Sequence, residues 1–186
     1  MKIKKNKIVI TGGYLKGRII KTINHPLIRP TTNIIRQTLF NWLSKIIVNA
    51  NCLDCFAGSG ILSFEAISRR AYYITLLENN LLIFKQLLYN KTNLSIKLVN
   101  IIYTNALKWL SSTDKKFDII FIDPPFESNL INKTINIINK RNILSNFSIV
   151  YIESKIQTNV KIPITWILYK QKLTKNVAYR LYYINN

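Results

Sequence analysis

An acid, two prolines and an aromatic residue follow the apolar run at 117–122, in the order Asp123-Pro124-Pro125-Phe126. Proline cannot donate to a sheet ladder and biases the preceding residue toward an extended backbone, so the pattern predicts a strand that ends in a stiff turn. The turn would present the Asp123 carboxylate, the Pro124 carbonyl and the Phe126 ring together. These groups suit the exocyclic amine of a flat base, although an ordinary strand with a proline-rich turn would have the same residues.

A glycine-rich turn, Ala57-Gly58-Ser59-Gly60, follows an earlier apolar run at 51–56 and precedes a helical pattern. Strand, glycine turn and helix form the nucleotide-binding unit of doubly wound folds, and Gly58 and Gly60 would let the backbone approach a ligand closely. The third glycine of the dinucleotide fingerprint is missing, because Ser63 stands there. We therefore predict a cofactor site at this turn.

Acids are rare in the chain, and half of the eight lie in or just after apolar runs: Asp54, Glu78, Asp123 and Glu153. Glu78 ends the strand after the glycine turn, where an acid commonly binds a ribose diol, although a surface acid is the alternative. Asn105 follows the next strand, where an amide can bind the edge of an adenine. We count Asp54 and Phe56, in the strand before the glycine turn, among the predicted cofactor-binding residues.

A helix is predicted to begin after Pro30, with Thr31 as its N-cap. Apolar residues recur at helical spacing over 35–46 and predict a face packed on the core. Because helix N-termini bind anions, Thr31, Thr32 and Arg36 could contact the carboxylate of a ligand. The sequence leaves both interpretations open.

The chain carries 27 lysines and arginines and a formal net charge of +19, with a pI near 10.1. Such a charge favours polyanionic partners, although codon bias toward Ile, Asn and Lys could account for part of it. Residues 1–21 contain no acid and predict a basic β-hairpin, with Lys16 and Arg18 as RNA-binding residues. A solvated, frayed terminus is the alternative.

Two cysteines, Cys52 and Cys55, lie three positions apart in a predicted strand. Their side chains should point to opposite faces, and with the lone His25 they provide too few ligands for zinc. We expect packed thiols and no metal site. No apolar run approaches the about 20 residues of a membrane helix, and no secretory signal fits the start, so a cytoplasmic protein without membrane contact is expected.

Strand and helix patterns alternate from residue 51 onward, which predicts an α/β fold with a mostly parallel sheet. The predicted strands are 51–56, 73–77, 96–102, 117–123 and 147–153, the predicted helices are 61–70, 81–89 and 130–139, and 164–169 and 177–184 should form a closing antiparallel pair. Ligands of such sheets bind at the carboxyl ends of the strands, where the candidate residues lie. NAD and S-adenosylmethionine both contain an adenosine, and the Asp-Pro-Pro-Phe turn favours the latter.

Taken together, these motifs resemble those of the bacterial RsmD family of 16S rRNA guanine-N2 methyltransferases. The motifs that carry the resemblance extend over nearly the whole chain: Ile10-Thr11-Gly12-Gly13, Lys16-Gly17-Arg18, Arg29-Pro30-Thr31-Thr32, Thr38 to Leu43, Leu53 to Gly60, Glu65-Ala66, Ser68-Arg69, Asp123 to Phe126, Tyr151 to Ser154 and Val177 to Tyr182. The chain departs from the family pattern at Asn33, Gln37, Ser63 and Asn80.

The resemblance implies a single Rossmann-like methyltransferase domain over residues 1–186, with helices on both faces of the sheet. It comprises an N-terminal hairpin and helix extension at 1–48 and a catalytic core at 49–186. It also implies S-adenosylmethionine as cofactor and guanosine 966 of 16S rRNA in the small ribosomal subunit as target. We expect a monomer. An adenine-N6 DNA methyltransferase and a non-catalytic rRNA-binding assembly factor are the alternatives.

A mechanism follows from the chemistry of the amine. Guanine N2 is a poor nucleophile, because its lone pair is delocalised into the ring. Asp123 and the Pro124 carbonyl would accept its two N–H bonds and direct the lone pair at the methyl group, so positioning and electrostatics would do most of the catalysis. Phe126 would stack on the extruded base.

Overall fold

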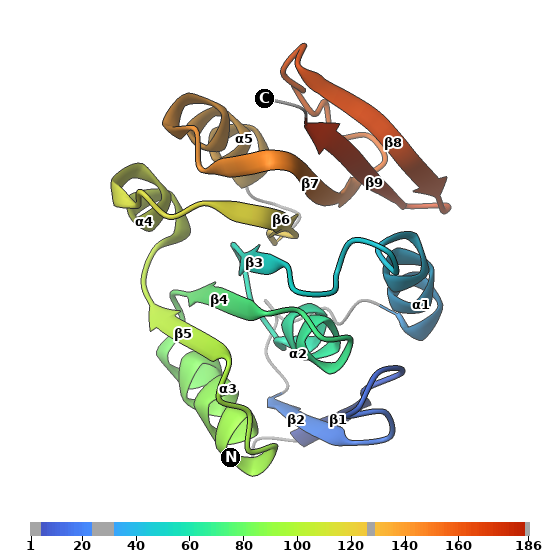
Figure 1. The fold of residues 1–186 in the computed structure, drawn as a ribbon, viewed down its shortest axis with the longest axis vertical. Helices are drawn as coiled ribbons and strands as arrows, with labels where there is room; N and C mark the ends of the chain where they lie inside the picture. Colours follow the sequence, from blue (N-terminus) through green and yellow to red (C-terminus); the bar gives the residue numbers. More distant parts are fainter. Residues whose placement is uncertain (1–4, 24–31, 126–128, 185–186) are drawn as a thin grey trace.

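A seven-stranded sheet runs through the molecule in the order β5-β4-β3-β6-β7-β9-β8 (Figure 1). The computed structural model describes residues 5–23, 32–125 and 129–184. The strands of the sheet are β3 Asn51–Asp54, β4 Tyr73–Glu78, β5 Val99–Tyr103, β6 Phe117–Ile122, β7 Leu144–Lys155, β8 Trp166–Leu173 and β9 Val177–Ile184. The first five strands in this order are parallel, and β9 is antiparallel to both β7 and β8. The predicted mostly parallel sheet and its closing antiparallel pair are confirmed.

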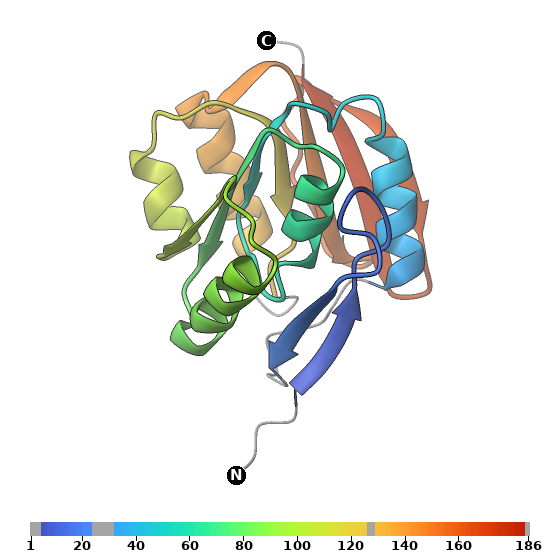
Figure 2. The same cartoon turned by 60° about the horizontal axis from the view of Figure 1, so that its bottom comes forward.

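Helices cover both faces of this sheet (Figures 1 and 2). They are α1 Asn33–Trp42, α2 Ile61–Ser68, α3 Leu81–Asn93, α4 Ala106–Ser112 and α5 Leu130–Arg141. One core cluster joins the first three helices to the sheet, and a second cluster joins α4 and α5 to its other face. The layered α/β architecture is therefore the predicted one, and ligands of such folds bind at the carboxyl edge of the parallel strands.

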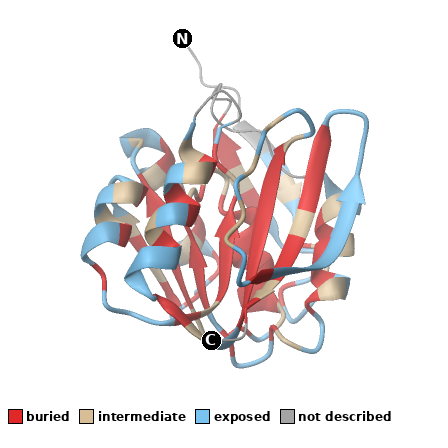
Figure 3. Ribbon diagram, turned by 90° about the horizontal axis from the view of Figure 1, so that it is seen from above, coloured by how far each residue is buried: buried red, intermediate tan, exposed pale blue. Residues whose placement is uncertain are grey.

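The central strands are buried on both faces, which explains why their sequences are apolar without alternation. In β6, Ile119 and Phe121 belong to the cluster under α1–α3, whereas Ile120 and Ile122 belong to the cluster under α4 and α5. Figure 3 shows these strands as buried over most of their length. The end of such a strand can therefore hold a side chain between the sheet and its helices.

The two cysteines are packed thiols, as predicted. Both are buried and free, and they lie in opposite core clusters, Cys52 under α1–α3 and Cys55 under α4 and α5. Burial raises the pKa of the Cys55 thiol well above its usual value. Both cysteines are therefore ordinary core residues.

The N-terminal hairpin forms a separate two-stranded antiparallel sheet of β1 Lys5–Val9 and β2 Ile19–Ile23. The Asn90 side chain in α3 holds β2, because its amide donates to the Lys21 carbonyl at 2.7 Å and its oxygen accepts from the Lys21 amide at 3.0 Å. The predicted hairpin is thus present, but its connecting loop is longer than a tight turn at the two glycines. The division into an extension at 1–48 and a core at 49–186 remains a prediction.

Candidate functional site

Four carboxyl side chains line up across adjacent strands at the carboxyl edge of the sheet. We call Glu78, Asp54, Asp123 and Glu153 the acid row. They lie at or within two residues of the carboxyl ends of β4, β3, β6 and β7, which are consecutive in the sheet. Each lies two residues after a side chain of the core cluster under α1–α3. Because side chains alternate along a strand, the four acids fall on the same face. With strands about 4.8 Å apart, the row is roughly 14 Å long.

A pocket of about 190 Å³ lies along the acid row and is lined by all four acids. Its other walls come from the turn after β3 and the loops that follow β4, β5 and β6. Among the residues predicted from the sequence, seven line this pocket: Asp54, Phe56, Gly58, Glu78, Asn105, Asp123 and Pro124. Residues from four strand ends thus form one cavity at the edge where ligands bind in such folds.

Glu78 connects the glycine turn to the start of α3. Its Oε2 accepts a hydrogen bond from the Gly58 amide at 3.1 Å, and its Oε1 accepts from the Asn80 amide at 2.8 Å. The side chain is 8% exposed. A carboxylate has about four lone-pair sites, so a carboxylate oriented in this way suits the hydroxyl groups of a ribose.

Asp54 is more deeply buried, at 2% exposure. The Ser63 hydroxyl donates to its Oδ2 at 2.6 Å, and the Phe56 amide donates to its Oδ1 at 3.3 Å. Burial raises the pKa of Asp54 to about 6, the charge of Glu78 adds to this, and the two donors oppose it. The departure from the family pattern at Ser63 therefore adds a donor that supports the buried carboxylate.

The two glycines of the turn differ in what surrounds them. Both have positive φ, +51° at Gly58 and +75° at Gly60. A Cβ on Gly58 would meet nothing closer than the Phe56 carbonyl oxygen at 3.9 Å, whereas a Cβ on Gly60 would lie 2.5 Å from Leu87 and 2.8 Å from Phe64. Gly58 therefore leaves space on the pocket side, and Gly60 allows close packing of the turn against α2 and α3.

The Asp-Pro-Pro turn begins directly after β6, and Asp123, Pro124 and Pro125 all line the pocket. Pro124 is buried and Asp123 is partly exposed. Phe126, the predicted stacking residue, lies outside the described residues. The structure therefore brings Asp123 and Pro124 to the pocket along the acid row.

Glu153 also lines the pocket, although it was not assigned to the site from the sequence. Its Oε2 accepts a hydrogen bond from the Tyr151 hydroxyl at 3.1 Å, and the two residues lie on the same face of β7. Its place at a strand end among few acids was visible in the sequence. Its position beside Asp123 was not, because that depends on the pairing of β6 with β7.

Asn105 lines the pocket and also begins α4 as its N-cap. Its side-chain oxygen accepts from the Lys108 amide at 3.1 Å. The cap directs the oxygen toward the helix, so the predicted contact with an adenine edge would come from the amide Nδ2. That contact remains a prediction.

The start of α1 differs from its predicted role. Thr32 is the N-cap and is exposed, and Thr31 lies outside the described residues. Thr32 and Arg36 are not among the described residues that line the pocket. Arg36 is fully buried against other partners, which corrects its predicted contact with a ligand carboxylate.

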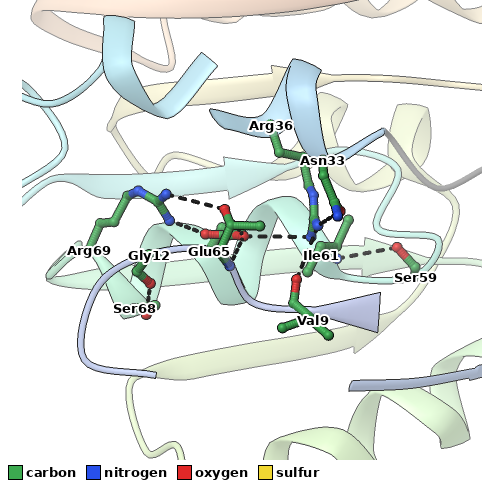
Figure 4. Close-up of polar contacts among 10 residues, drawn as sticks. Val9, Gly12, Asn33, Arg36, Ser59, Ile61, Glu65, Ser68 and Arg69 are labelled. Carbon is green, nitrogen blue, oxygen red and sulfur yellow. Dashed lines mark hydrogen bonds and ion pairs between the residues drawn. The ribbon is translucent and has the colours of Figure 1, made fainter. Parts of the chain in front are cut away.

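Arg36 instead belongs to a buried polar cluster beneath the hairpin loop (Figure 4). We call Glu65, Arg36, Arg69 and Thr11 the hairpin dock. Arg36 donates to the Val9 carbonyl at 3.0 Å and lies 3.6 Å from Glu65, which also pairs with Arg69. Glu65 accepts from the Thr11 amide at 2.6 Å and the Thr11 hydroxyl at 2.8 Å. Burial lowers the pKa of Arg36, and the charge of Glu65 opposes that shift.

The hairpin loop packs against the end of α2 that is remote from the pocket. The Tyr14 amide donates to the Ser68 carbonyl at 2.8 Å, and the Leu15 amide donates to the Ser68 hydroxyl at 2.9 Å. Ile61, at the other end of this helix, lines the pocket. Figure 2 shows the hairpin loop beside α2. Eight helical residues extend about 12 Å, so the exposed Lys16 and Arg18 on this loop lie on a different part of the surface from the pocket.

The described residues were also compared with the requirements of a metal site and of a membrane-spanning helix. Among them, no three His, Cys, Asp or Glu side chains form a group that could hold a metal ion. No helix in the same part of the chain is both long and apolar enough to cross a membrane.

Comparisons with known proteins concern the sequence and the fold of the whole chain. The model of the family described as "Conserved hypothetical protein 95" matches residues 8–183. The chain is 49% identical over 180 residues to "Ribosomal RNA small subunit methyltransferase D" of Buchnera aphidicola subsp. Acyrthosiphon pisum, covering 96% of this chain and 94% of that protein.

Two solved structures extend the comparison. A putative methyltransferase, yhhF, from Escherichia coli superposes with a TM-score of 0.89 at 37% identity, over 97% of this chain and 99% of that chain. The Thermus thermophilus 16S rRNA N2 G1207 methyltransferase, solved with AdoMet and guanosine, has a TM-score of 0.74 at 13% identity, over 100% of this chain and 52% of that one. At that identity the second likeness concerns the fold alone.

Proposed function

Because the chain belongs to the RsmD family of ribosomal RNA small subunit methyltransferases, we propose that it methylates the exocyclic N2 of a guanine in 16S rRNA, with S-adenosylmethionine as the methyl donor. The observation that carries the proposal is the acid row, which leads from the glycine turn to the Asp123-Pro124 turn within one pocket. A cofactor bound along its first half would present its methyl group to a base held at its second half.

The pocket residues fit S-adenosylmethionine. Space beside Gly58, where a Cβ would meet no atom within 3.9 Å, allows a ligand to approach the backbone. Glu78 would bind the ribose hydroxyls, Asn105 the adenine, and Asp54 and Phe56 would flank the methionine part. When bound, the cofactor supplies an activated methyl group on a sulfonium cation, and the buried negative charge of the row favours such a cation.

Catalysis by this chain would then depend on holding the amine. The Asp123 carboxylate and the Pro124 carbonyl accept the two N–H bonds of guanine N2, which directs the nitrogen lone pair toward the methyl donor. Positive charge develops on the nitrogen as the new bond forms, and the nearby carboxylate stabilises it. Asp123 would also accept the proton that the methylated amine must lose. Phe126 would stack on the base.

The substrate in this proposal is guanosine 966 of 16S rRNA within the small ribosomal subunit, approached by a monomer in the cytoplasm. The family membership supports the RNA substrate, and the net charge of +19 supports attraction to its phosphates. Lys16 and Arg18, both exposed on the hairpin loop, would contact phosphates away from the target base. The distance between loop and pocket suits a large folded RNA.

The test is methyl transfer by the wild-type protein to small subunits from cells that lack the modification. Subunits that already carry the modification serve as the control. The RNA is digested, the product nucleoside is identified by mass spectrometry, and the modified position is mapped. We expect N2-methylguanosine at position 966. N6-methyladenosine would support the adenine alternative, and binding of subunits without methyl transfer would support a non-catalytic assembly factor.

A further inference from the structure

We propose that Glu153 is the residue that selects guanine over adenine, by accepting a hydrogen bond from the N1–H of the target base. This inference rests on the proposed function and concerns a side chain with no role in that mechanism. The Asp-Pro-Pro turn alone would bind an amine without distinguishing the base that carries it. Two acceptors for an amine serve guanine N2 and adenine N6 equally, so the turn alone does not identify the base.

Glu153 lies directly beside Asp123. In the parallel pairing of β6 with β7, Ile122 lies opposite Ile152, so Asp123 and Glu153 occupy the next pair of positions. Their side chains share a face of the sheet, and both line the pocket. Adjacent strands lie about 4.8 Å apart, a spacing that one base edge can bridge.

Glu153 ends the acid row on the side away from the glycine turn. The row order Glu78, Asp54, Asp123 and Glu153 follows the strand order β4-β3-β6-β7. A cofactor that extends from Glu78 toward Asp123 leaves the Glu153 end of the pocket for the base. Glu153 therefore lies at the end of the pocket that the proposed function assigns to the methyl acceptor.

A buried layer of aromatic rings sets the orientation of this carboxylate. Tyr151 is fully buried and donates its hydroxyl to Glu153 Oε2 at 3.1 Å. The Tyr151 ring packs edge-on against Phe121, with ring centroids 6.2 Å apart, and Phe121 lies two residues before Asp123. Burial raises the pKa of the Tyr151 hydroxyl well above its usual value, so the hydroxyl stays protonated and donates. Glu153 itself is 6% exposed.

The two bases differ at the atom beside the amine. Guanine has an N1–H donor next to N2, whereas adenine has a lone pair on N1 next to N6. An ionised carboxylate beside the amine acceptors binds the first arrangement and faces a lone pair in the second. A site built to bind a donor rejects an analogue that lacks it by large factors, because its buried acceptor is left without a hydrogen bond.

The experiment compares guanine with 2-aminopurine at the target position of small subunits, using wild-type protein and the Glu153→Gln variant. 2-Aminopurine keeps the amine but has a lone pair in place of N1–H. In the variant, the amide oxygen should keep the Tyr151 bond, so that the amide NH2 points toward the base. We expect the wild type to prefer guanine at least about 100-fold in kcat/KM, and the variant to lose or invert that preference.

Melting temperature and cofactor affinity are measured in parallel, and Glu153→Asp, which keeps an acceptor, should retain the preference for guanine. An unchanged preference in Glu153→Gln, or loss of both substrates together, would overturn the inference. If the wild type still makes N2-methylguanosine in that case, the proposed function stands. If the wild type makes none, the proposed function fails and the inference fails with it.

Discussion

The acid row and the hairpin dock both bury carboxylates, but they surround them with different partners. Glu65 in the dock is paired with Arg69 and lies 3.6 Å from the Arg36 guanidinium. In the row, two of the acids accept hydrogen bonds from neutral donors: Glu78 from backbone amides, and Asp54 from a hydroxyl and a backbone amide. The dock neutralises its acid with cations of the chain itself, whereas Asp54 in the row is oriented by neutral donors.

We propose that this difference separates a structural acid, Glu65, from an acid that serves a ligand, Asp54. A carboxylate paired with a cation contributes to stability through partners that are already present. Carboxylates held by neutral donors keep their negative charge, and burial makes that charge costly, as the raised pKa of Asp54 shows. A buried carboxylate of this kind is expected where a cationic ligand compensates the free-energy cost of burying its charge. Variants at the two sites should therefore differ in whether they lose stability or cofactor binding.

Glu65→Gln should strongly destabilise the protein. The substitution removes the charge that compensates two guanidinium groups, and breaking a buried ion pair in this way costs about 3–5 kcal/mol. Urea denaturation should show the loss, while the folded variant binds the cofactor with wild-type affinity. Asp114→Asn is the control, because the Asp114–Arg141 pair is exposed and its loss should change stability by less than about 0.5 kcal/mol. A large loss of cofactor affinity in Glu65→Gln would contradict the purely structural role of Glu65.

Asp54 should make stability depend on pH in the direction opposite to that of an ion-paired acid. Its pKa is raised from 3.8 to about 6 by burial, so the folded state binds the proton more tightly than the unfolded state does. This tighter proton binding contributes roughly 2–3 kcal/mol to stability below pH 3.8. The contribution is lost as the pH rises through about 6. The unfolding free energy of the wild type relative to Asp54→Asn should therefore fall between pH 4 and pH 7. A constant difference over that range would show that Asp54 is not buried as a carboxylate.

Gly58→Val should weaken cofactor binding, and Gly17→Val should not. Both glycines have positive φ, +51° and +84°, and a Cβ at either position meets no close neighbour. Both variants should therefore lose about 1–2 kcal/mol of stability from backbone strain. Only the valine at position 58 occupies pocket space, so calorimetry should find a loss of cofactor affinity there alone. Equal affinities in the two variants would place the cofactor away from this turn.

Replacement of Lys16 and Arg18 by alanine should have the smallest effect. The loop lies at the far end of α2 from the pocket, so cofactor affinity should not change. If each side chain contacts one phosphate, the salt dependence of subunit binding should fall by about 0.7–0.9 per contact in a log–log plot. A double alanine variant at the exposed Lys115 and Lys140 removes the same charge and should leave that slope nearly unchanged. Equal slopes for both double variants would indicate attraction without a specific contact.

The sequence predicted the fold and most of the pocket because both depend on local patterns. The alternation of apolar strands with helical periodicity gives the parallel sheet, and the residues at its strand ends necessarily lie at one edge. Asp54, Glu78 and Asp123 could be found in this way. The same reasoning identified the hairpin and the packed cysteines.

The remainder depends on contacts between residues distant in sequence. Glu65 and Arg69 have the spacing of a helical ion pair, but no local pattern shows that Arg36 joins them, since its partners Val9 and Glu65 lie 27 and 29 residues away. Arg36 was therefore expected at the ligand. Glu153 was similarly left out of the site, because its position beside Asp123 follows from strand order.

The central claim, that the Asp123 end of the acid row performs methyl transfer, is tested most directly by single-turnover methylation of small subunits with saturating cofactor. Asp123→Ala should lower the rate of methyl transfer by about 10²–10³-fold, comparable to the loss of one group that stabilises transition-state charge. Cofactor affinity should stay nearly unchanged, and Asp123→Asn, which keeps an acceptor oxygen, should retain more activity than alanine. A wild-type rate in Asp123→Ala would contradict the account.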